Sequence, residues 1–206
     1  MPNKKFDAKQ FSAFIKEFYT APPNKFVVVD VPKTRYLVID GKGNPEQQDF
    51  TGIIKWFYSV VHAAKPFTQK AMGKHFGYPP TEFQFWAKNS KDFVDGNKSK
   101  WLWRVLVLCG DFMPKAVIDD AMAQVAQRLG PPPSPAKLKF LNEGKCVQYL
   151  HVGDYSGVAK VCEKLYGQYL PANKLTPSGY YHEIYLNDPT RAMPKKRKIL
   201  IRQPVE

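Results

Sequence analysis

The stretch GYYHEIYLNDP, residues 179–189, places an acidic residue inside a run of aromatic and β-branched side chains. Such a run is typical of a strand that is at least half buried. Because successive side chains of a strand point to opposite faces, Tyr181, Glu183 and Tyr185 should share one face, with His182 on the other. A buried carboxylate is costly unless it is paired, so Glu183 requires an explanation.

Two explanations of Glu183 follow from the residues alone. An ion pair with Arg104, Lys198 or Arg202 would satisfy the carboxylate inside the protein. Alternatively, the carboxylate borders a groove, where it attracts a cationic guest or accepts a proton. The sequence leaves both explanations open.

Aromatic side chains on two further predicted strands could wall such a groove. They are Trp101 and Trp103 on one strand, and Phe83 and Phe85 or Trp86 on the other. Rings that are not needed to fill a core offer flat surfaces to a planar or cationic guest. Ordinary core packing is the alternative interpretation for each ring.

Composition indicates an ordinary globular protein. With 206 residues and 44% hydrophobic content, the chain can bury a core in one domain or in two closely joined halves. No apolar run reaches membrane-spanning length and the first residues lack a secretion signal, so we expect a cytoplasmic protein with no membrane partner. The three cysteines form no CxxC pair and read as reduced thiols.

Motifs for cofactor chemistry are missing from the sequence. The four histidines are scattered, no third glycine completes a dinucleotide fingerprint after Gly41, and no GxSxG element is present. We therefore expect no cofactor and no metal site.

Positive charge raises the question of a polyanionic partner. The net charge is +13, and the densest run is Lys195-Lys196-Arg197-Lys198. An exposed turn before a last strand explains this run, and a nucleic-acid patch is the alternative.

Periodicity predicts an alternation of helices and strands. Helices are expected at 6–20, 50–64, 113–130 and 156–170, and strands at 25–32, 34–43, 82–89, 101–110, 137–142, 145–153, 180–187 and 198–205. The predicted class is therefore α+β.

The element order repeats after the PPPSP segment that follows Gly130. A shift of 105 residues sets Thr51-Gly52 against Ser156-Gly157, each at the start of a predicted helix. This predicts a duplicated module with pseudo-two-fold packing. The expected organisation is one domain over 1–206, with an N-terminal helix at about 6–20, a first module at about 24–110, a connecting helix and linker at about 114–135, and a second module at about 136–206.

Four segments together resemble the GyrI-like small-molecule-binding proteins. They are RYLVIDGKGNP, CVQYLHVGDYSGVAKVCEKLYGQYL, YYHEIYLNDP and KILIRQPV, and the resemblance runs from about residue 24 onward. It implies two β-α-β-β modules with antiparallel sheets around a central cleft that accepts lipophilic, often cationic, aromatic compounds. The family's cleft glutamate falls on Glu183. No helix-turn-helix precedes the domain, so the chain is not expected to be a one-component transcription regulator.

In length and in its abundance of Trp and Tyr, the chain looks like stand-alone GyrI-like proteins that hydrolyse the cyclopropane of DNA-alkylating compounds within an aromatic cage. The resemblance implies a protective hydrolase with Glu183 as the base and with Tyr181 or Tyr185 donating to the substrate's oxygen. The residues expected to bind the substrate are Trp101, Trp103, Trp86, Phe85, Tyr181 and Tyr185. A non-catalytic drug-binding protein is the alternative, and a basic protein that contacts DNA or a topoisomerase is a third hypothesis.

Overall fold

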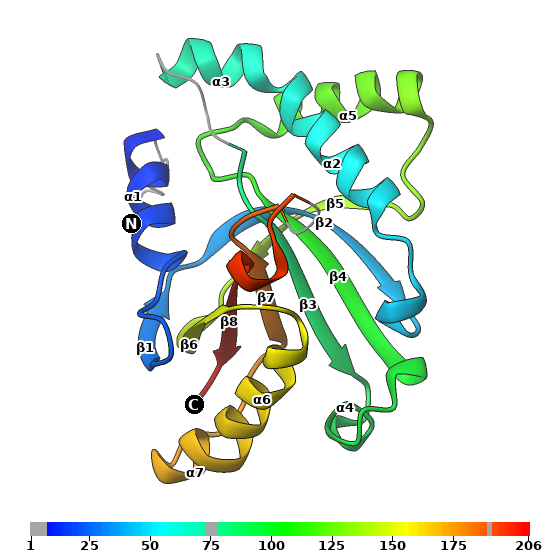
Figure 1. The fold of residues 1–206 in the computed structure, drawn as a ribbon. Helices are drawn as coiled ribbons and strands as arrows, with labels where there is room; N and C mark the ends of the chain where they lie inside the picture. Colours follow the sequence, from blue (N-terminus) through cyan, green and yellow to red (C-terminus); the bar gives the residue numbers. More distant parts are fainter. Residues whose placement is uncertain (1–7, 73–77, 189–190) are drawn as a thin grey trace. The chain divides into compact units, whose positions relative to one another are not determined.

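The computed structural model describes residues 8–72, 78–188 and 191–206 (Figure 1). These residues form two compact units. Unit 1 comprises the described residues of Met1–Ala13, Thr34–Thr81 and Phe85–Leu141, and unit 2 comprises those of Phe14–Lys33, Glu82–Gln84 and Asn142–Glu206. None of the helices in the described part of the chain is long and apolar enough to cross a bilayer.

Unit 1 is built on antiparallel strands. β2 (Thr34–Lys42) lies between β4 (Trp101–Leu108) and β5 (Ala136–Leu141), and β3 (Thr81–Ala87) borders β4. In the β2–β4 register Ile39 lies opposite Val105, and both side chains are fully buried. These strands are rich in β-branched residues, which pack well on a pleated surface.

Two helices of unit 1, α2 (Thr51–Ala63) and α5 (Lys115–Leu129), pack side by side (Figure 1). The expected helix at 50–64 has apolar residues at helical spacing, and these are buried, namely Ile53, Phe57, Val60, Val61 and Ala64. The Asp49 side chain accepts a hydrogen bond from the Thr51 backbone N–H at 2.9 Å, which supports the start of α2.

Two helical segments of unit 1 lie outside the helices expected from the sequence. They are α3 (Lys65–Met72) and α4 (Ser90–Val94). Pro66 is tolerated in α3 because it occupies the first turn, where a backbone N–H has no helical acceptor. α4 begins after Asn89, whose side chain accepts from the Lys91 N–H at 3.0 Å. Two short 3-10 turns are η1 (Pro45–Gln47) and η2 (Lys98–Lys100).

Unit 2 contains four antiparallel strands in the order β1, β6, β8, β7. Their bounds are Phe26–Val31, Gly144–Val152, Lys198–Pro204 and Tyr181–Tyr185. α6 (Ser156–Lys164) packs on β6 and continues through a π-helical turn, η3 (Leu165–Tyr169), into α7 (Leu170–Ala172). The inner strand β8 carries Ile199, Leu200 and Ile201, which are at most 1% exposed.

The remaining elements also agree with the sequence. α1 spans Ala8–Phe18 within the predicted first helix. From the sequence we also expect Asp7 to cap this helix, but Asp7 lies outside the described residues. Lys195 and Lys196 of the basic run lie in the exposed turn η4 (Pro194–Lys196), Arg197 is half-buried, and Lys198 begins β8, so the turn before the last strand is as predicted.

The α+β class with antiparallel strands is confirmed. α2 begins at Thr51 and α6 at Ser156, the two positions that the internal comparison pairs. The duplication, the central cleft and the module boundaries stay predictions.

Candidate functional site

The candidate site centres on Glu183 of β7, in unit 2. Tyr181 Oη donates to Glu183 Oε1 at 2.8 Å, and Tyr185 Oη donates to Glu183 Oε2 at 2.6 Å. Each carboxylate oxygen therefore accepts one phenolic hydrogen bond, and the three side chains lie on one face of β7, as strand alternation predicts. Hydrogen bonds from two neutral donors favour the ionised carboxylate. Glu183 is only partly buried.

The two tyrosines are held as neutral donors. Burial, reinforced by the negative charge of Glu183, raises the pKa of both Tyr181 and Tyr185 well above the ordinary phenol value. Neither phenol can therefore act as a base near neutral pH. The carboxylate of Glu183 is the group in this cluster that can accept a proton from water or attract a cation.

More aromatic side chains of the same unit pack next to Tyr185. The Phe83 ring meets Tyr185 edge-on with centroids 5.4 Å apart, and the Tyr155 and Tyr185 centroids are 6.0 Å apart. The Arg197 guanidinium lies 4.8 Å from the Tyr155 ring centroid. Sequence reasoning missed Tyr155 and Arg197. The available signal was that Tyr155 directly precedes a predicted helix in a family-like segment.

Cys162 of α6 also contacts this cluster. Its Sγ lies 3.4 Å from Tyr181 Oη and donates to it. Burial raises the pKa of the Cys162 thiol to about 11, so the thiol is neutral at physiological pH.

The opposite face of β7 carries a buried ion network around His182. His182 Nδ1 lies 2.8 Å from Glu143 Oε1, and His182 Nε2 lies 3.0 Å from Glu82 Oε2 in an ion-pair contact without hydrogen-bond alignment. Arg202 Nη1 donates to Glu143 Oε2 at 2.7 Å. The charge quartet consists of Glu82, Glu143, His182 and Arg202. Its side chains are at most 5% exposed. Two anions and two cations balance one another, which a buried cluster requires.

The pKa values of the quartet reflect this pairing. Burial alone would lower the pKa of His182, but Glu143 and Glu82 outweigh it and raise that pKa to about 9. Burial alone would raise the pKa of Glu143, but His182 and Arg202 outweigh it and lower that pKa to about 2. His182, Glu143 and Arg202 are therefore charged near neutral pH.

The quartet also holds the end of α1. Arg202 Nη2 and Gln148 Nε2 donate to the Phe18 carbonyl oxygen at 2.6 and 3.1 Å, and Tyr19 Oη donates to Glu82 Oε1 at 2.5 Å. A cation at the last carbonyls of a helix also complements the helix dipole. The face of β7 opposite Glu183 is therefore held in place by side chains from segments that lie far apart in the sequence.

Two of the cations considered as partners of Glu183 make other ion pairs. Arg202 pairs with Glu143, as described, and in unit 1 Arg104 Nε donates to Asp40 Oδ1 at 2.6 Å.

In unit 1, Trp103 is buried against the neighbouring strand. It lies opposite Gly41 in the β2–β4 register, and a Cβ on Gly41 would lie 2.1 Å from the indole ring. Phe50, the residue before α2, meets the indole edge-on with centroids 5.0 Å apart. Glycine is needed at position 41 because the ring occupies the space of a side chain.

Other predicted substrate-binding rings also have packing partners in unit 1. Trp101 stacks on Phe93 with centroids 4.6 Å apart and lies 6.1 Å from the ring of Phe85. The Arg104 guanidinium lies 5.3 Å from the Trp86 ring centroid. The grouping of these rings with Glu183 around one guest stays a prediction.

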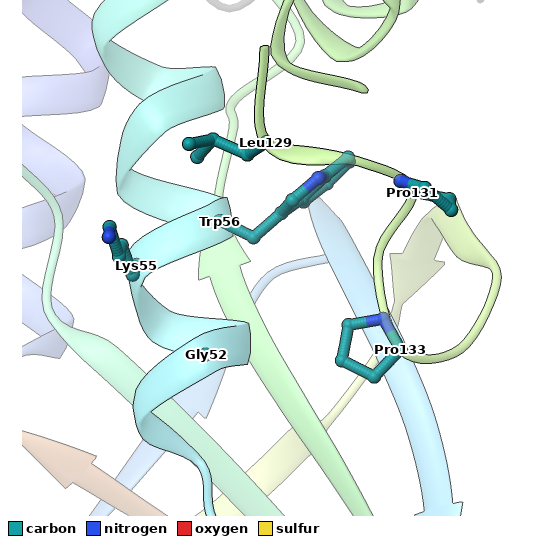
Figure 2. A pocket seen from close by; sticks show the side chains of 6 residues that line it. All are labelled: Gly52, Lys55, Trp56, Leu129, Pro131 and Pro133. Atoms are coloured by element: carbon teal, nitrogen blue, oxygen red, sulfur yellow. The ribbon is translucent and has the colours of Figure 1, made fainter. Parts of the chain in front are cut away.

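Unit 1 also has two surface hollows along α2 and α5. The first, of about 240 Å³, is shown in Figure 2 and is lined by Gly52, Lys55, Trp56, Leu129, Pro131 and Pro133. The second, of about 350 Å³, is lined by Ser59, His62, Ala63, Pro66, Gln124, Val125 and Arg128. None of the predicted site residues lines either hollow.

Within residues 8–72, 78–188 and 191–206, no three side chains of His, Cys, Asp or Glu are arranged as metal ligands.

Comparison with known proteins supports the resemblance seen in the sequence. The family model described as the GyrI-like small molecule binding domain matches residues 105–206. No functionally curated protein matches the chain. An uncharacterized conserved protein from Listeria innocua is 28% identical with a TM-score of 0.78, and the match covers 95% of this chain and 98% of that one.

Two further solved structures are similar. A hydrolase from Listeria innocua is 28% identical with a TM-score of 0.75, over 98% of this chain and 100% of that one. The C-terminal domain of EcmrR shares the fold at 13% identity, with a TM-score of 0.53 over 88% of this chain and 97% of that one. Residues 105–206 of this chain therefore resemble the GyrI-like small-molecule-binding domain.

Proposed function

We propose that this protein binds planar aromatic compounds beside Glu183 and hydrolyses cyclopropanoid electrophiles among them, with Glu183 as general base. The observation that carries the proposal is the pair of phenolic hydrogen bonds on the partly exposed Glu183 carboxylate. A base must be ionised and oriented before it can accept a proton, and this arrangement favours both. The similarity to a hydrolase from Listeria innocua at 28% identity supports an enzymatic role.

The proposed reaction adds water across a strained ring. In a cyclopropane conjugated to a ring carbonyl, the oxygen of water bonds to a cyclopropane carbon while the bond between that carbon and the conjugated ring breaks. The released electron pair moves to the carbonyl oxygen and makes a phenoxide, which then takes up a proton. The proton lost by water goes to Glu183. A well-placed general base contributes roughly 100- to 10,000-fold in rate, which suits an electrophile that is already strained.

Tyr181 and Tyr185 hold the base in this scheme. In the structure each hydroxyl donates to Glu183, so donation to the guest's oxygen, the role suggested by the family resemblance, requires one of these hydrogen bonds to break. Phe83 and Tyr155 lie next to Tyr185 and offer apolar surface to a flat guest.

The test is turnover of a spirocyclopropyl cyclohexadienone fused to an indole ring. Multiple turnovers to the water adduct support hydrolysis, whereas stoichiometric protection without product leaves only the drug-binding alternative. Glu183→Gln should retain binding of the planar guest and slow hydrolysis at least about tenfold, because the amide cannot accept the proton. The matched control is Glu163→Gln on the exposed side of α6, which should hydrolyse at the wild-type rate. Unchanged turnover in Glu183→Gln would remove Glu183 from the mechanism.

A further inference from the structure

The second hollow of unit 1, the one of about 350 Å³, combines polar side chains with aliphatic walls. Its lining residues come from α2, the start of α3, and α5, all within unit 1. Four side chains are polar, namely Ser59, His62, Gln124 and Arg128, and three are aliphatic, namely Ala63, Pro66 and Val125. None of these described lining residues is acidic. Small-molecule sites usually have apolar walls and a few polar groups that orient the ligand.

Arg128 gives this hollow a positive charge that no anion of the chain offsets. Its exposed side chain lies in the last turn of α5 and makes no hydrogen bond or ion pair with the described residues. Two other arginines of unit 1 have internal acceptors, because Arg35 donates to the Gly110 carbonyl and Arg104 donates to Asp40. A guanidinium presents parallel N–H groups that match the two oxygens of a carboxylate. Arg128 can therefore bind an external carboxylate.

His62 is oriented by a neighbouring side chain. Its Nδ1 lies 3.1 Å from Tyr78 Oη. The Tyr78 ring meets Tyr58 edge-on with centroids 5.5 Å apart, and Lys65 Nζ lies 4.5 Å from the Tyr78 centroid. When the Tyr78 hydroxyl donates to Nδ1, the hydrogen of the neutral imidazole is on Nε2. His62 then offers Nε2–H as a second donor to an anion.

The remaining lining residues indicate what the anion should be attached to. Ser59 Oγ donates to the Lys55 carbonyl at 2.9 Å, so its own hydrogen is already used within α2. The apolar part of the lining consists of aliphatic side chains, and no aromatic ring of the described residues lines the hollow. A bare inorganic anion would leave these aliphatic walls in contact with water. An anion that carries a saturated body would cover them, and burial of each CH₂ group contributes roughly fourfold in affinity.

We propose that the second hollow of unit 1 binds a small aliphatic carboxylate. Arg128 and His62 donate to the carboxylate oxygens, and the saturated body packs against the three aliphatic side chains. A volume of about 350 Å³ lies near the lower end of the range for small-molecule sites, so the body is no larger than one or two saturated rings. The proposal does not depend on the proposed function, because Glu183 belongs to unit 2 and does not line this hollow.

Isothermal titration calorimetry of the full chain with cyclohexanecarboxylate tests the ligand class. We expect one bound molecule per chain. Acetate should bind at least about tenfold more weakly, because it lacks the ring that covers the aliphatic walls. Cyclohexanecarboxamide should also bind at least about tenfold more weakly, because hydrogen bonds to a charged acceptor are stronger than those to a neutral one.

Variants of Arg128 test the carboxylate contact. Arg128→Gln should weaken binding of cyclohexanecarboxylate at least about tenfold. Arg128→Lys keeps the charge but loses the two parallel N–H groups, so its affinity should lie between those of wild type and Arg128→Gln. The matched control is Lys115→Gln, which removes one positive charge from the same helix. Lys115 pairs with Asp119 and does not line the hollow, so this variant should bind like wild type.

The location of the ligand is tested on the aliphatic wall. Ala63→Leu places a larger side chain in the hollow and should weaken binding at least about tenfold. If that variant does not fold, ¹³C-methyl NMR of the wild type gives the same information, because the methyl signals of Ala63 and Val125 should shift as cyclohexanecarboxylate is added.

Several results would overturn the proposal. They are an absence of heat and of methyl shifts at millimolar cyclohexanecarboxylate, an equal loss of affinity in Arg128→Gln and Lys115→Gln, and equal affinity for acetate or inorganic phosphate. Unchanged affinity in Arg128→Gln together with lower stability in urea would also overturn it, since Arg128 would then only complement the dipole of α5. Glu183→Gln should bind cyclohexanecarboxylate like wild type. Loss of hydrolysis in that variant and loss of carboxylate binding in Arg128→Gln are therefore separate outcomes.

Discussion

Replacing Glu143 by glutamine should strongly destabilise the protein, because it removes one anion from the buried charge quartet. The pKa of Glu143 is lowered from 4.5 to about 2. At about 1.36 kcal/mol per pH unit, this difference corresponds to roughly 3 kcal/mol of stabilisation of the ionised carboxylate. Breaking a buried ion pair by removing one partner costs about 3–5 kcal/mol. We therefore expect Glu143→Gln to lower the free energy of unfolding by about 3 kcal/mol.

The loss of stability in Glu143→Gln should become smaller both at low pH and at high pH. Because the pKa of Glu143 is lower in the folded protein, its contribution is complete above pH 4.5 and disappears as the pH falls through about 2. Because the pKa of His182 is raised from 6.5 to about 9, its contribution is complete below pH 6.5 and disappears as the pH rises through about 9. The difference between wild type and variant should therefore be largest between pH 4.5 and 6.5.

Urea unfolding across this pH range measures the difference directly. Asp119→Asn is the control, because Asp119 forms an exposed ion pair with Lys115 on α5, and such pairs contribute at most about 0.5 kcal/mol. A Glu143→Gln protein as stable as Asp119→Asn near pH 5.5 would refute the argument. So would a loss that does not vary with pH.

Two other predictions concern packing and thiol reactivity. Gly41→Ala should cost about 1–3 kcal/mol in urea unfolding, because the new Cβ would overlap the Trp103 ring. Gly52→Ala, where no atom lies within 4 Å of the new Cβ in the first turn of α2, should instead add up to about 1 kcal/mol; equal effects at both positions would contradict this packing. Cys162, whose pKa is raised to about 11, should react with iodoacetamide at neutral pH at least about 100-fold more slowly in the folded than in the unfolded protein, and equal rates would contradict the raised pKa.

Elements with a strong side-chain period were predictable from the sequence. The apolar spacing of α2, which includes Ile53 and Phe57, predicted the correct element and the correct buried face. The alternation around Glu183 did the same for β7. Both succeeded because residues on one face recur with the period of the helix or strand. α3 was missed because KPFTQKAM has few apolar residues and follows α2 without a turn signal.

The partners within the site were less predictable. Residue spacing placed Tyr181 and Tyr185 on the same face as Glu183. It could not show that both hydroxyls donate to the carboxylate, because side-chain rotamers cannot be inferred from spacing. The charge quartet was missed for a different reason. Glu82, Glu143 and His182 come from three separate segments, and long-range pairing of single charged residues has no local pattern.

The charge quartet determines where the protein can be divided. The family match begins at residue 105, yet Glu82, Tyr19 and the Phe18 carbonyl precede that point and neutralise or bind side chains within the match. A fragment reduced to 105–206 would bury His182 and Arg202 against Glu143 alone, with one surplus positive charge. A gene fusion or domain exchange cut at residue 105 would therefore divide this compact unit, and the exchanged segment must also carry residues 14–33 and 82–84.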